Sequence, residues 1–68
     1  MDFIEFLALM NEVKLAKTYY LRWGQTLMNV LYRTHPDLYD QITGTDFDCF
    51  YLDENIGSVI SFLLDVSP

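Results

Sequence analysis

Cys49 is the only cysteine of this 68-residue chain, so no internal disulfide can hold the fold together. A chain this short buries only about 60% of the surface that its unfolded form exposes, and small domains therefore usually add a disulfide, a metal or a partner subunit. One cysteine and one histidine cannot form a structural zinc site, and no cofactor is expected. Stability must come from apolar packing or self-association, and 51% hydrophobic residues favour both.

The spacing of the apolar residues predicts an all-α fold: a single small four-helix domain covering residues 1–68. The expected helices, of which the third is short, cover about residues 2–17, 22–33, 36–43 and 54–66. The predicted inward stripes also include Val13, Val30 and Val59, and the core is centred on eight residues: Leu7, Met10, Trp23, Leu27, Leu31, Ile42, Ile60 and Leu63.

The ends of these helices are indicated by residues with restricted or permissive backbones. Pro36 disfavours helical backbone at His35 and suits the first turn of a new helix, so the pair separates the second helix from the third. Gly44 stands where a residue in the left-handed conformation would end the third helix. Asp53 stands where its side chain would cap the fourth.

Residues 45–53 alternate Phe47, Cys49 and Tyr51, as a β-strand would. One short strand would have no partner in this chain, so an ordered loop with aromatic and acidic side chains is favoured. Gln25 and Asn29 lie one helical turn apart and face the same way. We expect them to tie the 44–48 segment to the second helix, with ligand binding as the alternative.

A spaced pattern runs through the middle of the chain: Arg22, Gly24-Gln25, Asn29 and Leu31, then Pro36-Asp37-Leu38, then Gly44-Thr45, Asp48, Phe50-Tyr51 and Asp53. With this pattern, which covers roughly positions 20–63, the chain resembles a group of small uncharacterised proteins of tailed phages and some bacteria. It departs from the pattern at Cys49, where a proline would make the loop more rigid. The resemblance implies a phage-type accessory protein and attaches no activity, ligand or site to it.

The net charge of −6 is unevenly distributed. All four basic residues lie between positions 14 and 33, whereas seven acids and no Lys or Arg follow position 36. Direct binding to nucleic acid is disfavoured, because that affinity comes from cations that displace counterions. A basic host or phage protein is the expected partner, with solubility alone as the competing explanation of the acids. The residues that we assign to this contact are Asp40, Asp46, Asp48, Glu54, Tyr39 and Tyr51.

No enzyme is expected, and no catalytic residue is assigned. A nucleophilic Cys49 needs a base within hydrogen-bond reach, and nothing in the spacing brings His35 to it. The acids beside Cys49 raise the pKa of a thiol, so a small buried hydrophobe is the favoured interpretation of this residue.

No metal site is expected either. Asp46 and Asp48 superficially suggest a calcium loop. In an EF-hand loop that begins at Asp46, the fifth, sixth and twelfth positions need an oxygen ligand, a glycine and a glutamate. This chain has Phe50, Tyr51 and Gly57 there.

The first and fourth helices carry more apolar residues than one inward stripe can hold. A two-fold homodimer would remove the excess from water, and we assign to its interface Leu9, Phe62 and Leu64. A self-associating structural or assembly component, with no separate ligand, is therefore the alternative function.

The first ten residues contain Asp2 and Glu5 in place of the basic segment that opens a signal peptide. No apolar run approaches the roughly 20 residues of a membrane span. We therefore expect no membrane contact and a cytoplasmic protein, in the host cell if a phage encodes it. The unpaired Cys49 agrees with a reducing compartment.

Overall fold

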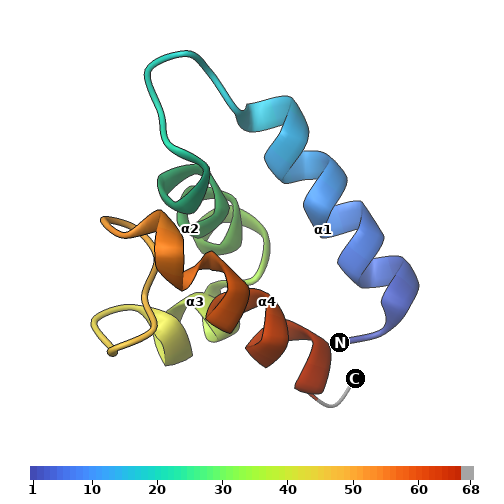
Figure 1. Ribbon diagram of the computed structural model, residues 1–68. Helices are drawn as coiled ribbons and strands as arrows, with labels where there is room; N and C mark the ends of the chain where they lie inside the picture. The colour runs from blue at the N-terminus through green and yellow to red at the C-terminus, as the bar shows by residue number, and fades with distance from the viewer. Residues whose placement is uncertain (67–68) are drawn as a thin grey trace.

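The computed structural model describes residues 1–66, which form four α-helices and no strand (Figure 1). The helices are α1 (Phe3–Ala16), α2 (Trp23–Thr34), α3 (Pro36–Ile42) and α4 (Ile56–Asp65), and a single 3-10 turn, η1 (Asp53–Asn55), leads into α4. The predicted small all-α four-helix domain with a short third helix is therefore confirmed. None of the helices in this part of the chain is both long and apolar enough to cross a membrane.

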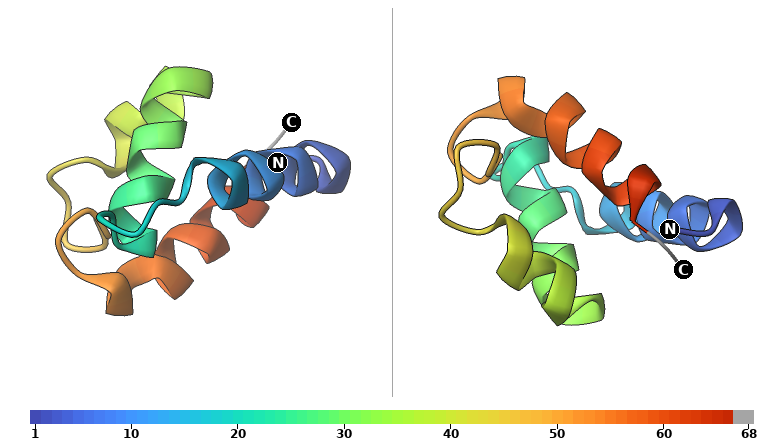
Figure 2. Two further views of the ribbon diagram at one scale, coloured as in Figure 1. Left: turned by 90° about the horizontal axis from the view of Figure 1, so that it is seen from above. Right: turned by 90° about the horizontal axis from the view of Figure 1, so that it is seen from below.

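Helix α2 is central, since it packs against α1, α3 and η1, while α1 also contacts α4. The first half of α1 projects beyond the other helices in both views of Figure 2. The start of α1 and the end of α4 meet, and the amino group of Met1 donates a hydrogen bond to the carbonyl of Val66. The 43–52 loop lies at the other side of the molecule, beside the start of α2 (Figure 1).

The break between α2 and α3 and the end of α3 follow the sequence predictions. Pro36 is the first residue of α3, and His35 has a non-helical backbone. Gly44 has a φ of +77°, in the left-handed region that glycine adopts without a steric penalty. The chain can therefore turn sharply after α3 and enter the loop.

The core lies around α2, and half of the predicted core is fully buried there. Leu27, Leu31, Ile42 and Leu63 are at most 3% exposed. Met10 and Ile60 are partly buried. Val13, Val30 and Val59, which belong to the predicted inward stripes, are buried as well. Leu9 and Met28 complete the core without having been predicted for it.

Two core predictions are wrong. Leu7 is 50% exposed and Trp23 is 47% exposed. The inward side of α1 is centred on Leu9 and Val13, of which Val13 belongs to the predicted stripe and Leu9 lies beside that stripe on the helix surface. Because α1 has apolar residues on nearly every side, spacing alone could not select the buried one. Leu9 is only 2% exposed, so its assignment to a dimer interface is also wrong.

Asp53 connects the C-terminal half of the chain to the start of α2. Its Oδ1 atom accepts a hydrogen bond of 3.0 Å from the backbone N–H of Gly24, the second residue of α2. The first N–H groups of a helix lack partners within the helix, and Arg22 at the N-cap makes no side-chain cap. Asp53 therefore caps α2 across 29 residues of sequence. The prediction that Asp53 caps the fourth helix is wrong, because α4 begins after η1 and has no side-chain cap.

Gly24 is the point where the loop backbone touches α2. A Cβ atom at this position would lie well inside van der Waals distance of the Cys49 carbonyl oxygen and 2.8 Å from Oδ1 of Asp53. The thiol of Cys49 in turn donates to the Gly24 carbonyl at 3.4 Å. Only a residue without a side chain allows this approach.

We expect Gly24→Ala to destabilise the protein by about 1–3 kcal/mol, because the added methyl group must push the loop backbone away from α2. Gly57→Ala is the matched control, since a Cβ there has nothing within 4 Å. That control should stabilise the protein by roughly 0.5–1 kcal/mol through helix propensity. Urea unfolding followed by circular dichroism measures both, and equal effects of the two alanines would contradict the close approach.

Candidate protein-binding surface

Side chains, and not a strand ladder, hold the loop that follows α3. Oδ2 of Asp48 accepts from the backbone N–H of Gly44 at 2.9 Å, and Oδ1 accepts from that of Phe50 at 2.8 Å. The side-chain amide of Asn55 donates to the carbonyls of Asp46, at 3.1 Å, and Asp48, at 3.0 Å. One carboxylate and one amide thus satisfy backbone groups that would otherwise remain unpaired. The ordered loop expected over 45–53 forms, except that Asp53 itself belongs to η1.

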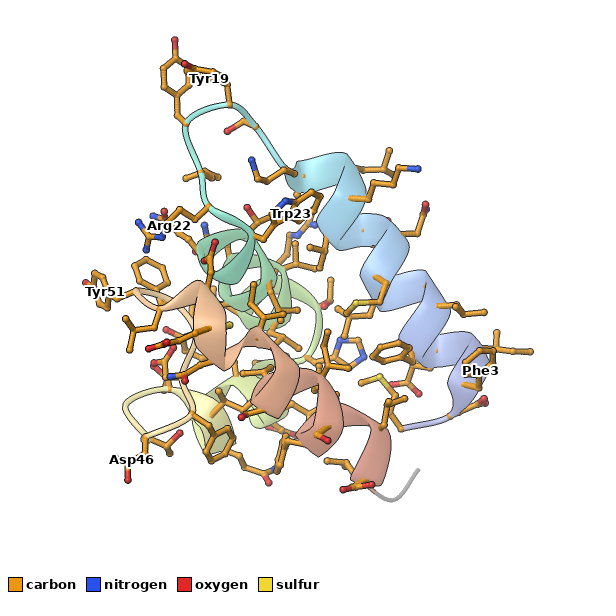
Figure 3. The ribbon with its side chains drawn as sticks, viewed as in Figure 1. Phe3, Tyr19, Arg22, Trp23, Asp46 and Tyr51 are labelled. Atoms are coloured by element: carbon orange, nitrogen blue, oxygen red, sulfur yellow. The ribbon has the colours of Figure 1, made fainter. Side chains whose placement is uncertain are left out.

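Arg22 contacts the C-terminal end of the same loop. Its Nη2 atom donates to the Phe50 carbonyl at 2.6 Å, and its Nε atom lies 3.7 Å from Oδ1 of Asp53. In Figure 3, Arg22 and Tyr51 lie at the same edge of the molecule, with Asp46 below them. The cation nearest the loop is therefore already paired with protein groups.

The tether predicted at Gln25 and Asn29 is wrong. Within residues 1–66, neither amide makes a side-chain hydrogen bond to the loop, and Asn29 instead borders a hollow with Ala16 and Leu21. The amide that does tether the loop belongs to Asn55. Sequence reasoning missed it because an asparagine just before a helix normally signals a local cap and not a contact to the preceding loop.

Three of the six residues assigned to partner binding converge on one pocket. We call this the tyrosine pocket; its volume is about 210 Å³, and its lining residues are Met28, Tyr39, Thr43, Asp48, Phe50 and Tyr51. Tyr51 is 80% exposed and packs edge-on against Phe50, with ring centroids 4.8 Å apart. Tyr39 is held by a similar edge contact of 5.1 Å with Tyr32.

The other three assigned residues are exposed acids that do not line this pocket. Asp40 follows Tyr39 in α3, Asp46 lies in the loop, and Glu54 lies in η1. Within the described chain none of the three forms an ion pair. Asp48 differs from them, because both of its oxygens already accept backbone N–H groups.

The basic residues other than Arg22 are engaged or located on the α1 side. Arg33 pairs with Glu12 at 3.3 Å, and the Lys17 ammonium lies 5.3 Å from the centroid of the Trp23 ring. Lys14 is in the last turn of α1. The segment from Tyr39 to Glu54 therefore presents a negatively charged and aromatic surface, which we call the acidic surface.

The residues predicted for a dimer interface do not share one exposed patch. Leu9 is in the core, and Phe62 is partly buried with its ring centroid 5.7 Å from that of Phe47. Leu64 alone is clearly exposed.

Comparison of the chain with protein-family models, curated proteins and solved structures found no match. Among the residues that the structure describes, no group of three His, Cys, Asp or Glu side chains is arranged to hold a metal ion. The surface described above is therefore interpreted from its own geometry and chemistry.

Cys49 lies beneath the loop and is fully buried, so the expectation of a small buried hydrophobe is confirmed. Burial, and then the neighbouring charge of Asp48, raises the pKa of its thiol to about 11. His35 pairs with Glu5 at 3.0 Å and lies at the opposite end of α2 from Gly24, which contacts the thiol. The thiol is therefore protonated at neutral pH and poorly nucleophilic.

The raised pKa of Cys49 predicts a stability that falls at high pH. An unfolded thiol ionises near its ordinary pKa of 9.0, whereas the folded thiol holds its proton until about pH 11. The stabilisation is therefore complete below pH 9 and is lost between pH 9 and 11, at about 1.4 kcal/mol per pH unit. Tyrosines and lysines also ionise in this range, so the free energy of unfolding is measured against pH for both the wild type and Cys49→Ala. The difference between the two profiles is the contribution of the thiol, and parallel profiles would contradict the assignment.

Proposed function

We propose that this protein is a small acidic accessory protein of the phage type, which acts by protein–protein interaction. Its acidic surface binds a basic host or phage protein. The observation that carries the proposal is the presence of three exposed acids without ion partners in the described chain, Asp40, Asp46 and Glu54, in the same segment that supplies most of a pocket with two tyrosines in its wall. Aromatic side chains commonly anchor protein interfaces, and unpaired charges around them steer association.

A fixed arrangement distinguishes this surface from acids that only keep a protein in solution. The loop that carries Asp46 and Tyr51 is fixed by Asp48, Asn55 and Arg22, so its charges are presented in one arrangement. A preordered surface loses less conformational freedom when a partner binds. The resemblance noted above for positions 20–63 also supports an accessory role.

The acidic surface should speed association with its partner. After the partner has been captured from a host lysate and purified, we expect the double variant Asp46→Asn, Glu54→Gln to slow association at low salt by roughly tenfold. The difference in association rate between the variant and the wild type should shrink as salt is added, because screening weakens the same attraction in the wild type. Stopped-flow or surface-based kinetics at two salt concentrations measures this effect.

The matched control removes two charges elsewhere. Asp37 lies with Met1 and Val66 at the end of the molecule where the chain termini meet, and Asp65 precedes Val66. The variant Asp37→Asn, Asp65→Asn has the same net charge as the test variant and should associate almost as fast as the wild type. If both variants slow association equally, the effect belongs to net charge and not to the acidic surface.

A second candidate function, self-association, is favoured by the outer side of α1. Four large apolar side chains are exposed there, and no other element covers them: Phe3 at 64%, Ile4 at 74%, Leu7 at 50% and Leu15 at 72%. With about 200 Å² for each fully exposed side chain, they amount to roughly 500 Å² per copy. A two-fold pair would bury about 1,000 Å², which is less than the roughly 1,200–2,000 Å² of stable interfaces and is typical of a weak one.

The dipole of α1 favours an antiparallel pair, because the dipoles of two antiparallel helices oppose each other favourably. The proposed interface thus replaces the one predicted at Leu9, Phe62 and Leu64.

Sedimentation velocity tests this second candidate. We expect the wild type to dimerise at high micromolar concentrations and the variant Ile4→Gln, Leu15→Gln to remain monomeric, because it removes two of the four apolar contacts. The control variant Tyr19→Gln, Tyr20→Gln changes two exposed residues outside α1 and should dimerise like the wild type. A wild type that is monomeric at millimolar concentration would contradict self-association.

A further inference from the structure

The tyrosine pocket combines aromatic walls with a carboxylate. Phe50 and Tyr51 form one aromatic pair at its rim, Tyr39 comes from α3, and Asp48 contributes the charge. None of the six lining residues is basic. An aromatic ring attracts a cation to its face, and an adjacent carboxylate adds a second attraction.

The volume of the pocket limits what can enter it. At about 210 Å³ it is smaller than the roughly 300 Å³ at which sites for small-molecule ligands begin. A volume of this size suits one long side chain and not a nucleotide or a larger metabolite.

Asp48 is prepared to receive a cation. Each carboxylate oxygen accepts one backbone N–H and keeps a free lone pair, since an ionised carboxylate offers about four acceptor sites. These bonds fix the carboxylate in place before any partner binds. The nearest cation of the chain, Arg22, is already bonded to the Phe50 carbonyl and to Asp53.

From this geometry we infer that the tyrosine pocket is a binding site for one cationic side chain, a lysine or arginine, inserted by the basic partner. The inference rests on the proposed function, because it names the group of that partner which the acidic surface receives. The acids Asp46 and Glu54 steer the partner, and the pocket then holds its cation between the tyrosine rings.

The experiment uses capped amino acids, so it needs no identified partner. Nα-acetyl-lysine amide, Nα-acetyl-arginine amide and the neutral Nα-acetyl-norleucine amide are titrated into ¹⁵N-labelled protein and followed by amide chemical shifts. We expect both cations to bind at millimolar concentrations, with shifts concentrated over residues 43–51, and the norleucine derivative to leave these signals unchanged. The tighter of the two cations identifies the side chain that the partner supplies.

Variants at the rim separate an aromatic contact from general attraction to an acidic protein. Tyr51→Leu should weaken cation binding roughly fivefold, because it removes one aromatic face while leaving the charge unchanged. Tyr51→Phe keeps the aromatic face and should bind like the wild type, and so should Tyr19→Leu, which changes an exposed tyrosine outside the pocket. The amide spectrum of each variant shows directly whether the fold is intact.

Two results would overturn the inference: equal shifts with the norleucine derivative, or cation binding that is the same in Tyr51→Leu and the wild type. This failure is distinguishable from that of the proposed function. If the cations do not enter the pocket but the Asp46→Asn, Glu54→Gln variant still slows association, the acidic surface stands and the pocket assignment is wrong.

Discussion

The contact between Gly24 and the 49–53 segment is the constraint on which the rest of the structure depends. At this point the backbone N–H of Gly24 donates to the carboxylate of Asp53, and the buried thiol of Cys49 donates to the carbonyl of Gly24. The missing side chain of Gly24 allows Asp53 to reach the first turn of α2. A larger residue at position 24 would separate the loop from α2, and the acidic surface would lose the contacts that order it.

This junction gives the acids of the C-terminal half two distinct roles. Asp48 and Asp53 are structural: their oxygens accept backbone N–H groups of the loop and of α2. Asp40, Asp46 and Glu54 are exposed, and none takes part in an ion pair in the described chain. A uniform acidic segment in the sequence is therefore divided by the fold into groups that build the loop and groups that face solvent. Solubility alone does not require the second set to lie in the segment that also supplies most of the tyrosine pocket.

The sequence was sufficient for the parts of the fold that local chemistry determines. Pro36 restricts the backbone and Gly44 permits the left-handed conformation wherever they occur, so the limits of α3 could be predicted. The buried side of α1 could not, because its apolar residues occupy most of its surface and only packing against α2 and α4 selects Leu9 over Leu7. Asp53 resembled a local cap because it precedes a helix, yet its partner is 29 residues away. Of the candidate site, residue types were predictable, whereas the convergence of Tyr39, Asp48 and Tyr51 depends on how α3 and the loop fold together.

The two proposed contact regions do not compete for space. Helix α1 and the 43–52 loop lie on opposite sides of the central helix α2 (Figure 1). A pair of copies joined through α1 would leave both tyrosine pockets open and would present two acidic surfaces at once. Two linked weak sites bind a partner with repeated basic side chains far more tightly than one, because the second contact forms within the same complex. Self-association and acidic recognition would then act together, with apolar burial supplying the pairing and charge supplying the choice of partner.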